Sequence, residues 1–121
     1  MERSARDRSL IERIIEDRET VEKRIGHFSL TKDSFCNDHT FEGEIAYDAI
    51  MNPVYRIVED AAHLSEEVIS ACPELAWHEM RGFRNFIAHG YGEIDRRIAW
   101  NVIVGDLPKL ARSLEKHAST L

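Results

Sequence analysis

The stretch WHEMRGFRNFIAHGYGEID, from Trp77 to Asp95, decides how the rest of this 121-residue chain is interpreted. At 100° per residue, a helix through it separates an apolar face from a polar one. The apolar face carries Met80, Phe83, Phe86 and Ile87. The polar face carries Arg81, Arg84, Asn85 and His89. Gly90 favours a helix end, because glycine adopts left-handed geometry at little cost. We therefore expect Tyr91 to lie just beyond the helix, beside the histidine.

A cation, an imidazole and a phenol on one rim suit the cleavage of a phosphodiester bond in RNA. The imidazole of His89 can take the proton of a 2′-hydroxyl, since imidazoles titrate near neutral pH. The guanidinium of Arg84 can hold the nonbridging oxygens while negative charge develops on phosphorus. Asn85 can orient His89 or the phosphate. This chemistry needs neither a metal nor a cofactor. From spacing alone, a solvated polar helix face followed by a Gly-Tyr-Gly turn explains the same residues.

The same stretch resembles the signature of the HepT-like ribonuclease toxins of the HEPN superfamily. The shared pattern is W-x4-G-F-R-N-x3-H-G-Y-x2-I-D, from Trp77 to Asp95, followed by D-L-P at Asp106–Pro108. It contains the R-x4-H-x-Y motif formed by Arg84, His89 and Tyr91. The match is dense from Trp77 to about Leu114 and thin before it. The resemblance therefore covers about a third of the chain.

The resemblance implies the toxin of a type VII toxin–antitoxin system, acting as a metal-independent endoribonuclease and a homodimer. It also implies an MntA-like nucleotidyltransferase antitoxin as partner, which adenylylates the motif tyrosine, here Tyr91. Members carry a glycine and an acid in the preceding long helix. Glu59 matches the acid, but Val58 stands where the glycine would be, so we leave Glu59 out of the predicted site.

Two other classes of function compete with this interpretation. One is a non-catalytic helical partner that binds a nucleotidyltransferase or a nucleotide, and the other is a plain interaction bundle. Loss of RNA cleavage on substitution of His89 separates the enzyme from both. A homodimer is also favoured by the single motif histidine and by apolar residues beyond those that one small bundle needs, notably Phe86, Trp100 and Ile103.

Composition predicts one domain, residues 1–121, with a single core. The net charge of −6 is unusual for a protein that binds RNA, because phosphate contacts need local positive charge. Its distribution is uneven, with −7 in residues 1–69 and +1 in residues 70–121. Arg81, Arg96 and Arg97 are therefore candidate RNA contacts around Arg84, forming a small basic patch on an acidic body.

Cysteine usage and hydropathy predict a cytoplasmic protein. Cys36 and Cys72 lie too far apart for a paired metal motif, and two free thiols are expected. Cys36-x-x-His39 lacks an obvious second half of a zinc site. No apolar run approaches the ~20 residues of a membrane span, and the first ten residues contain no signal-peptide core.

Apolar periodicity predicts an all-α fold, an antiparallel bundle of four main helices plus a short C-terminal helical piece. The first helix should span residues 4–25, followed by a loop or short helical turn over 27–37. A long second helix should run from Asp38 or Thr40 to Ser70, kinked near Asn52 by Pro53. The motif helix follows, and then a helix capped by Asp95. Gly105–Pro108 should bend or restart the chain before the last piece.

Overall fold

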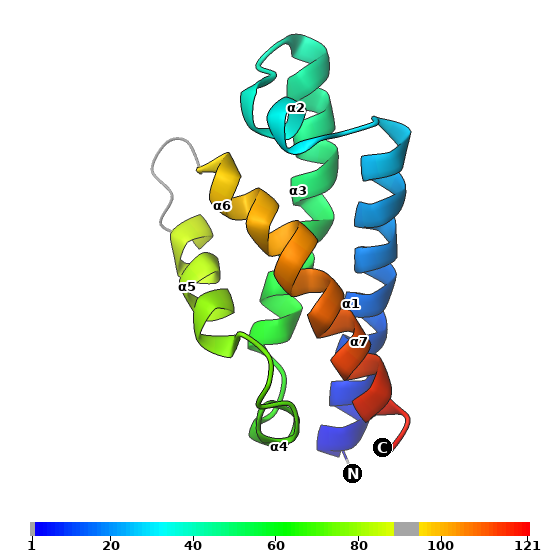
Figure 1. Ribbon diagram of the computed structural model, residues 1–121. Helices are drawn as coiled ribbons and strands as arrows, with labels where there is room; N and C mark the ends of the chain where they lie inside the picture. The colour runs from blue at the N-terminus through cyan, green and yellow to red at the C-terminus, as the bar shows by residue number, and fades with distance from the viewer. Residues whose placement is uncertain (1, 89–94) are drawn as a thin grey trace.

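The computed structural model describes residues 2–88 and 95–121, and every regular element in these residues is helical (Figure 1). The prediction of an all-α fold is therefore confirmed. The elements are α1 (Glu2–His27), α2 (Lys32–Asn37), α3 (Phe41–Ala62), α4 (Glu66–Ala71), α5 (Trp77–Ala88), α6 (Arg96–Asn101), η1 (Val102–Asp106) and α7 (Leu107–Ala118). The predicted positions of His89, Gly90 and Tyr91 lie outside the described residues.

The long helices run in alternating directions along the molecule (Figure 1). Helix α1 packs most extensively on α3 and also contacts α7, whereas α5 packs on α3. Their shared interior is aliphatic, as the periodicity predicts. Its fully buried side chains include Ile11, Ile14, Ile50, Val54, Ile57, Leu107, Leu110 and Leu114. Helix α5, which carries Arg84 of the motif, is held against the carboxyl half of α3.

Helix α3 passes through Pro53 without a break. A proline has no N–H to donate to the carbonyl four residues earlier, which leaves the Ala49 oxygen without its helical partner. Arg24 of α1 fills that position, since its Nη1 donates to the Ala49 oxygen at 2.7 Å. The apolar stripe that the sequence shows on both sides of the proline therefore stays in phase.

The predicted long helix ending at Ser70 is wrong, because α3 ends at Ala62 and a separate α4 begins at Glu66. The buried carboxylate of Asp7 explains the break. It accepts hydrogen bonds from the Ser65 backbone N–H at 3.0 Å and from its hydroxyl at 2.6 Å. Both bonds hold Ser65 in extended geometry, with a ψ of 161°.

The helical run continues through Gly105–Pro108, where the sequence predicts a bend or a restart of the chain. Helices α6 and α7 are joined by the π-helical turn η1, so that a continuous helical run spans 96–118. The Leu107 N–H donates to the Val102 oxygen, five residues earlier. A widened turn of this kind accommodates Pro108, which has no N–H to donate to Val104. The predicted short C-terminal piece is therefore the second half of one composite helix.

Among residues 2–88 and 95–121, no helix is both long and apolar enough to cross a bilayer. Two residues predicted to favour a dimer, Trp100 and Ile103, belong to the core of the chain instead. Ile103 is buried, and the Trp100 ring lies 5.2 Å from the ring of buried Phe35. Phe86 differs, since 39% of its surface is exposed.

Candidate functional site

Helix α5 places its two faces much as the periodicity predicts. Met80 and Phe83 are buried against the core, Ile87 is half-buried, and Phe86 is exposed. The indole N–H of Trp77 donates to the Cys72 oxygen at 2.8 Å, which fixes the start of the helix. The opposite face, with Arg81, Arg84 and Asn85, reaches solvent or lies at its edge. The polar face predicted for this helix is therefore present at Arg81, Arg84 and Asn85, whereas His89 lies outside the described residues.

Arg84 is held by a two-point ion pair with Glu59 of α3. Its Nε donates to one carboxylate oxygen at 2.9 Å, and its Nη2 donates to the other at 3.1 Å. The hydrogen bonds and the charge of Glu59 raise the pKa of Arg84, and those of Arg84 lower the pKa of Glu59. Both side chains remain accessible, with 41% and 52% of their surfaces exposed. Exposed pairs of this type contribute little to stability, so a competing anion can displace Glu59.

Glu59 is the site residue that the sequence analysis left out. The departure at Val58 from the family glycine argued against it, yet the structure brings the Glu59 carboxylate into direct contact with the motif arginine. The acid expected in the preceding helix of the family was the signal that pointed to it. Val58 is buried beneath the same contact region, where a larger residue than glycine is accommodated.

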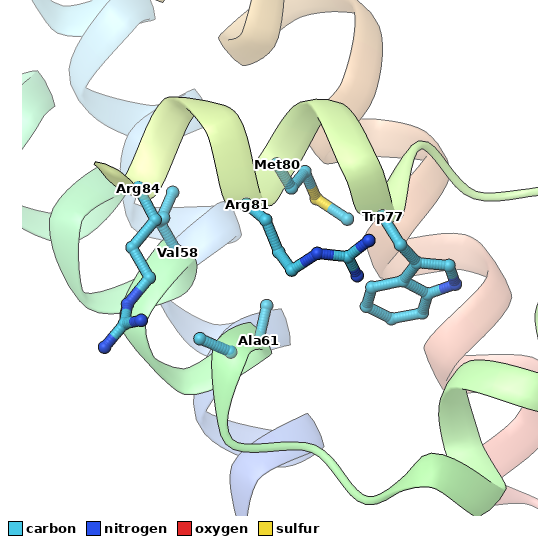
Figure 2. A pocket seen from close by; sticks show the side chains of 7 residues that line it. Val58, Ala61, Trp77, Met80, Arg81 and Arg84 are labelled. Carbon is cyan, nitrogen blue, oxygen red and sulfur yellow. The ribbon is translucent and has the colours of Figure 1, made fainter. Parts of the chain in front are cut away.

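A small apolar pocket adjoins Arg84 between α3 and α5 (Figure 2). Its walls are aliphatic and aromatic, and two arginines lie at its edge. The lining consists of Val58, Ala61, Ala62, Trp77, Met80, Arg81 and Arg84. Figure 2 shows the Arg81 side chain extending along it toward the Trp77 indole. Its volume of about 20 Å³ holds little more than a water molecule, so it is a shallow recess beside the rim.

The three arginines predicted to contact RNA lie in different environments. Arg81 is exposed beside Arg84. Arg97 is exposed and reaches Asp95, with its Nε 3.4 Å from a carboxylate oxygen. Only 13% of the Arg96 side chain is exposed, because its guanidinium contacts both oxygens of Glu44 at 2.8 Å and stacks on the Tyr47 ring at 3.7 Å. Arg96 thereby connects α6 to α3.

Asp95 caps α6 as the sequence predicts, since its side chain accepts from the Arg97 backbone N–H at 3.0 Å. The hydrogen bonds to Arg97 lower the pKa of this carboxyl group. The cap fixes the start of α6. The predicted catalytic His89 and the predicted acceptor Tyr91 lie in the interval 89–94, outside the described residues.

Both cysteines are free thiols, as the sequence predicts. Burial raises the pKa of Cys72, and nearby Glu74 adds to this effect. Within residues 2–88 and 95–121, no three histidine, cysteine or acidic side chains are grouped as metal ligands. His39, the possible second ligand of a Cys36-x-x-His39 site, instead contacts Glu44 at 3.0 Å.

Comparison with known proteins identifies the family to which this rim belongs. The family model described as "Ribonuclease HepT-like" matches residues 10–117, which is most of the chain and includes the whole motif stretch. The chain belongs to the HepT-like ribonuclease family. The matched range also includes Glu59, so the ion pair with Arg84 lies within the family domain.

Three curated relatives are named as candidate ribonucleases. One from Methanocaldococcus jannaschii is 29% identical over 85 residues, which cover 70% of this chain and 77% of the relative. A second from the same organism is 28% identical over 87 residues, covering 68% and 71%. A candidate ribonuclease HepT of Thermococcus cleftensis is 28% identical over 68 residues, covering 56% and 62%. No solved structure matches the chain significantly.

Proposed function

We propose that this protein is a metal-independent endoribonuclease and the toxin of a type VII toxin–antitoxin pair. The observation that carries the proposal is the solvent-accessible guanidinium of Arg84 on a helix that belongs to the HepT-like ribonuclease family. An accessible arginine followed five positions later by His89 provides an electrophilic clamp and a base for one reacting phosphate. We also propose that the protein acts on RNA in the cytoplasm, as one domain of residues 1–121.

In the proposed reaction, His89 takes the proton of a 2′-hydroxyl, and the 2′-oxygen attacks the adjacent phosphorus. Arg84 stabilises the charge on the nonbridging oxygens, and Asn85 orients the phosphate or the imidazole. The bond to the 5′-oxygen then breaks, and that oxygen receives a proton from a second acid. The products are a 2′,3′-cyclic phosphate and a 5′-hydroxyl, with no metal step required.

Glu59 occupies the position that a substrate phosphate requires. Its two oxygens contact two nitrogens of Arg84, which is also how a guanidinium binds phosphate in a bidentate pair. Substrate binding is therefore an exchange of one anion for another. The carboxylate holds the guanidinium in a defined orientation before the exchange, which limits the conformational entropy lost when the phosphate binds.

Among the candidate RNA contacts, Arg81 and Arg97 are proposed to bind phosphates beside the cleavage site because both are exposed. Arg96 would first have to leave Glu44 and Tyr47. We assign it a structural contribution in addition to any contact with RNA.

A homodimer would supply the second acid. One histidine cannot readily serve as base and acid in a single geometry, and a two-fold axis near the rim would bring two copies of His89 together. Exposed Phe86 and Ile98 flank the motif interval and are apolar enough to join such an interface. Light scattering that shows a fully active monomer at micromolar concentration would exclude the dimer.

Tyr91 is the proposed acceptor of AMP from a nucleotidyltransferase antitoxin. Gly90 and Gly92 flank it, so no neighbouring side chain blocks a second protein from the phenol. The added phosphate would place negative charge near Arg84, where it would repel RNA. Co-expression with the antitoxin followed by peptide mass analysis tests this, and an unmodified but inhibited complex would instead indicate occlusion.

The ribonuclease is tested by incubating purified protein with labelled RNA in EDTA. We expect cleavage that leaves 2′,3′-cyclic phosphate ends, and we expect Arg84→Ala and His89→Ala to lose at least about a hundredfold in rate. Arg6→Ala, an exposed arginine on α1, is the matched control. Activity that requires added Mg²⁺ would exclude the metal-free mechanism. Full activity in His89→Ala would favour the non-catalytic partner that binds a nucleotidyltransferase or nucleotide.

A further inference from the structure

A polar hollow lies at the opposite end of α5 from its junction with the motif interval. It lies between the end of α4 with the following turn and the carboxyl-terminal half of α7, and its volume is about 510 Å³. The side chains that matter in it are Cys72, Glu74, Arg112, Ser113, Lys116 and His117. We call this the α7 groove. It is far larger than the recess beside Arg84 and more polar.

The α7 groove concentrates positive charge on an acidic protein. Arg112, Lys116 and His117 all come from α7, and Glu74 is the only acid in its lining. Seven arginines elsewhere in the described part of the chain contact carboxylates within 4.0 Å, at Arg3, Arg13, Arg18, Arg56, Arg84, Arg96 and Arg97. Neither Arg112 nor Lys116 forms such a pair with any described residue, and both are exposed.

Helix capping does not explain the whole cluster. Lys116 and His117 lie in the last turn of α7, where cations interact favourably with the helix dipole. Arg112 lies more than one turn from the end at Ala118, beyond the reach of that effect. Hydrogen bonds from its own backbone N–H and from the Ser113 hydroxyl lower the pKa of Glu74, and the charge of Lys116 adds to this effect. One carboxylate beside Arg112 and Lys116 still leaves the lining with net positive charge.

We propose that the α7 groove binds phosphates of single-stranded RNA at a distance from the cleavage rim. The identity of the polymer rests on the proposed ribonuclease function, whereas the anion site rests on the groove itself. Arg112 and Lys116 are one turn apart, about 6 Å along the helix, which is comparable with the spacing of successive phosphates in an extended strand. The Thr120 hydroxyl already donates to the His117 oxygen at 2.6 Å, and the Ser113 hydroxyl donates to Glu74, so the two cations would make the phosphate contacts.

The shape of the groove favours a flexible polyanion over an apolar ligand. It is broad, and most of the side chains that line it are charged or polar. Contacts of this kind provide affinity without base specificity, since phosphates carry no sequence information. RNA held here would stay near the rim between cleavage events. An acidic protein segment is the competing occupant, and the experiment must separate the two.

The test measures binding of a fluorescent 20-nucleotide RNA by anisotropy across a salt series. The RNA is 2′-O-methylated throughout, so it keeps every phosphate but has no nucleophile for cleavage. We expect Arg112→Gln/Lys116→Gln to weaken binding about tenfold at low salt. The slope of log affinity against log salt should fall by about 1.4, since each lost phosphate contact removes about 0.7. Lys23→Gln/Lys32→Gln, two exposed lysines elsewhere, makes the same change in net charge.

A groove variant that binds with the same slope as the lysine control would overturn the proposal, and so would a wild-type protein that does not bind this RNA. Displacement of the RNA by polyglutamate as effectively as by unlabelled RNA would assign the groove to acidic proteins. The ribonuclease proposal fails separately. If unmodified RNA binds through the groove but is never cut, only the ribonuclease proposal is wrong. If the groove substitutions change neither binding nor cleavage, only the groove proposal is wrong.

Discussion

Arg84 on α5 and the cations of the α7 groove differ in whether a carboxylate already binds them. On the rim, the Arg84 guanidinium is already bound at two points by Glu59. In the groove, Arg112 and Lys116 form no ion pair with described residues. A paired guanidinium has a fixed orientation but must exchange partners to bind a ligand, whereas unpaired cations attract anions without orienting them. Orientation is what chemistry on one phosphate needs, and attraction is what retention of a polymer needs.

Arg96 provides a third state, a paired and shielded arginine, and removing it should have the largest effect on stability. Arg96→Gln loses two contacts with Glu44 and the stacking on Tyr47, so we expect the free energy of unfolding to fall by about 1–2 kcal/mol. Burial raises the pKa of Tyr47 to about 12, so the ring remains a neutral phenol throughout the measurement. Urea denaturation at neutral pH measures the loss.

The matched control is Arg97→Gln, which removes the same charge from the adjacent, largely exposed position. It should change stability by less than about 0.5 kcal/mol. RNA affinity should show the reverse order, with Arg97→Gln the weaker binder. If Arg96→Gln leaves stability unchanged and weakens RNA binding more, Arg96 belongs to the binding surface and its contacts with α3 are incidental.

Releasing Arg84 from its carboxylate should have a smaller effect, seen in substrate binding. Glu59→Gln removes the competing charge, and we expect KM for RNA cleavage to fall about three- to fivefold, equivalent to about 1 kcal/mol. The effect should disappear as pH falls through the lowered pKa of Glu59, since the protonated acid no longer competes.

Glu12→Gln on α1 is the control, since Glu12 is exposed and the substitution changes net charge equally. A KM that stays constant while kcat falls would show that Glu59 acts by positioning Arg84, with no competition against substrate. If Glu59→Gln and Glu12→Gln change KM equally, the change in net charge explains both effects.

The periodicity of α5 was sufficient to predict its helix, its two faces and the accessible Arg84, because these depend on residues close together in sequence. The cap at Asp95 is equally local. Contacts that join distant segments were not predictable. The break between α3 and α4 is held by hydrogen bonds from Ser65 to Asp7, 58 residues earlier. Arg24 supports the helix at Pro53 from another helix.

The candidate site follows the same division. The motif identified Arg84 from one stretch, while its partner Glu59 lies 25 residues earlier on α3, and only packing brings them together. The α7 groove depends on packing as well, since it brings Arg112 and Lys116 of α7 against the turn that carries Glu74. Trp100 was counted among the apolar residues beyond those that one bundle needs, but it lies partly buried against the core, with its ring 5.2 Å from that of Phe35.

Asp60, the neighbour of Glu59 on α3, offers the smallest test and isolates the effect of burial on a paired acid. Its carboxylate contacts Arg13 at 2.8 Å, yet the other oxygen is buried without a partner among the described residues. Burial raises the pKa of Asp60, with Arg13 opposing the effect, whereas Glu59 has its pKa lowered.

A raised pKa means that the folded state binds the proton of Asp60 more tightly than the unfolded state. Asp60 therefore costs stability when ionised, and that cost is relieved as pH falls from above its folded pKa toward the ordinary value near 3.8. As pH falls from 7 to 4, we expect the unfolding free energy of wild type to rise relative to that of Asp60→Asn by several tenths of a kcal/mol. Asp48→Asn, at an exposed position of the same helix, should show no such gain. If the unfolding free energies of the two variants instead show the same pH dependence, the ion pair with Arg13 offsets the burial of Asp60. Ion pairing alone would then determine how the acids of α3 titrate.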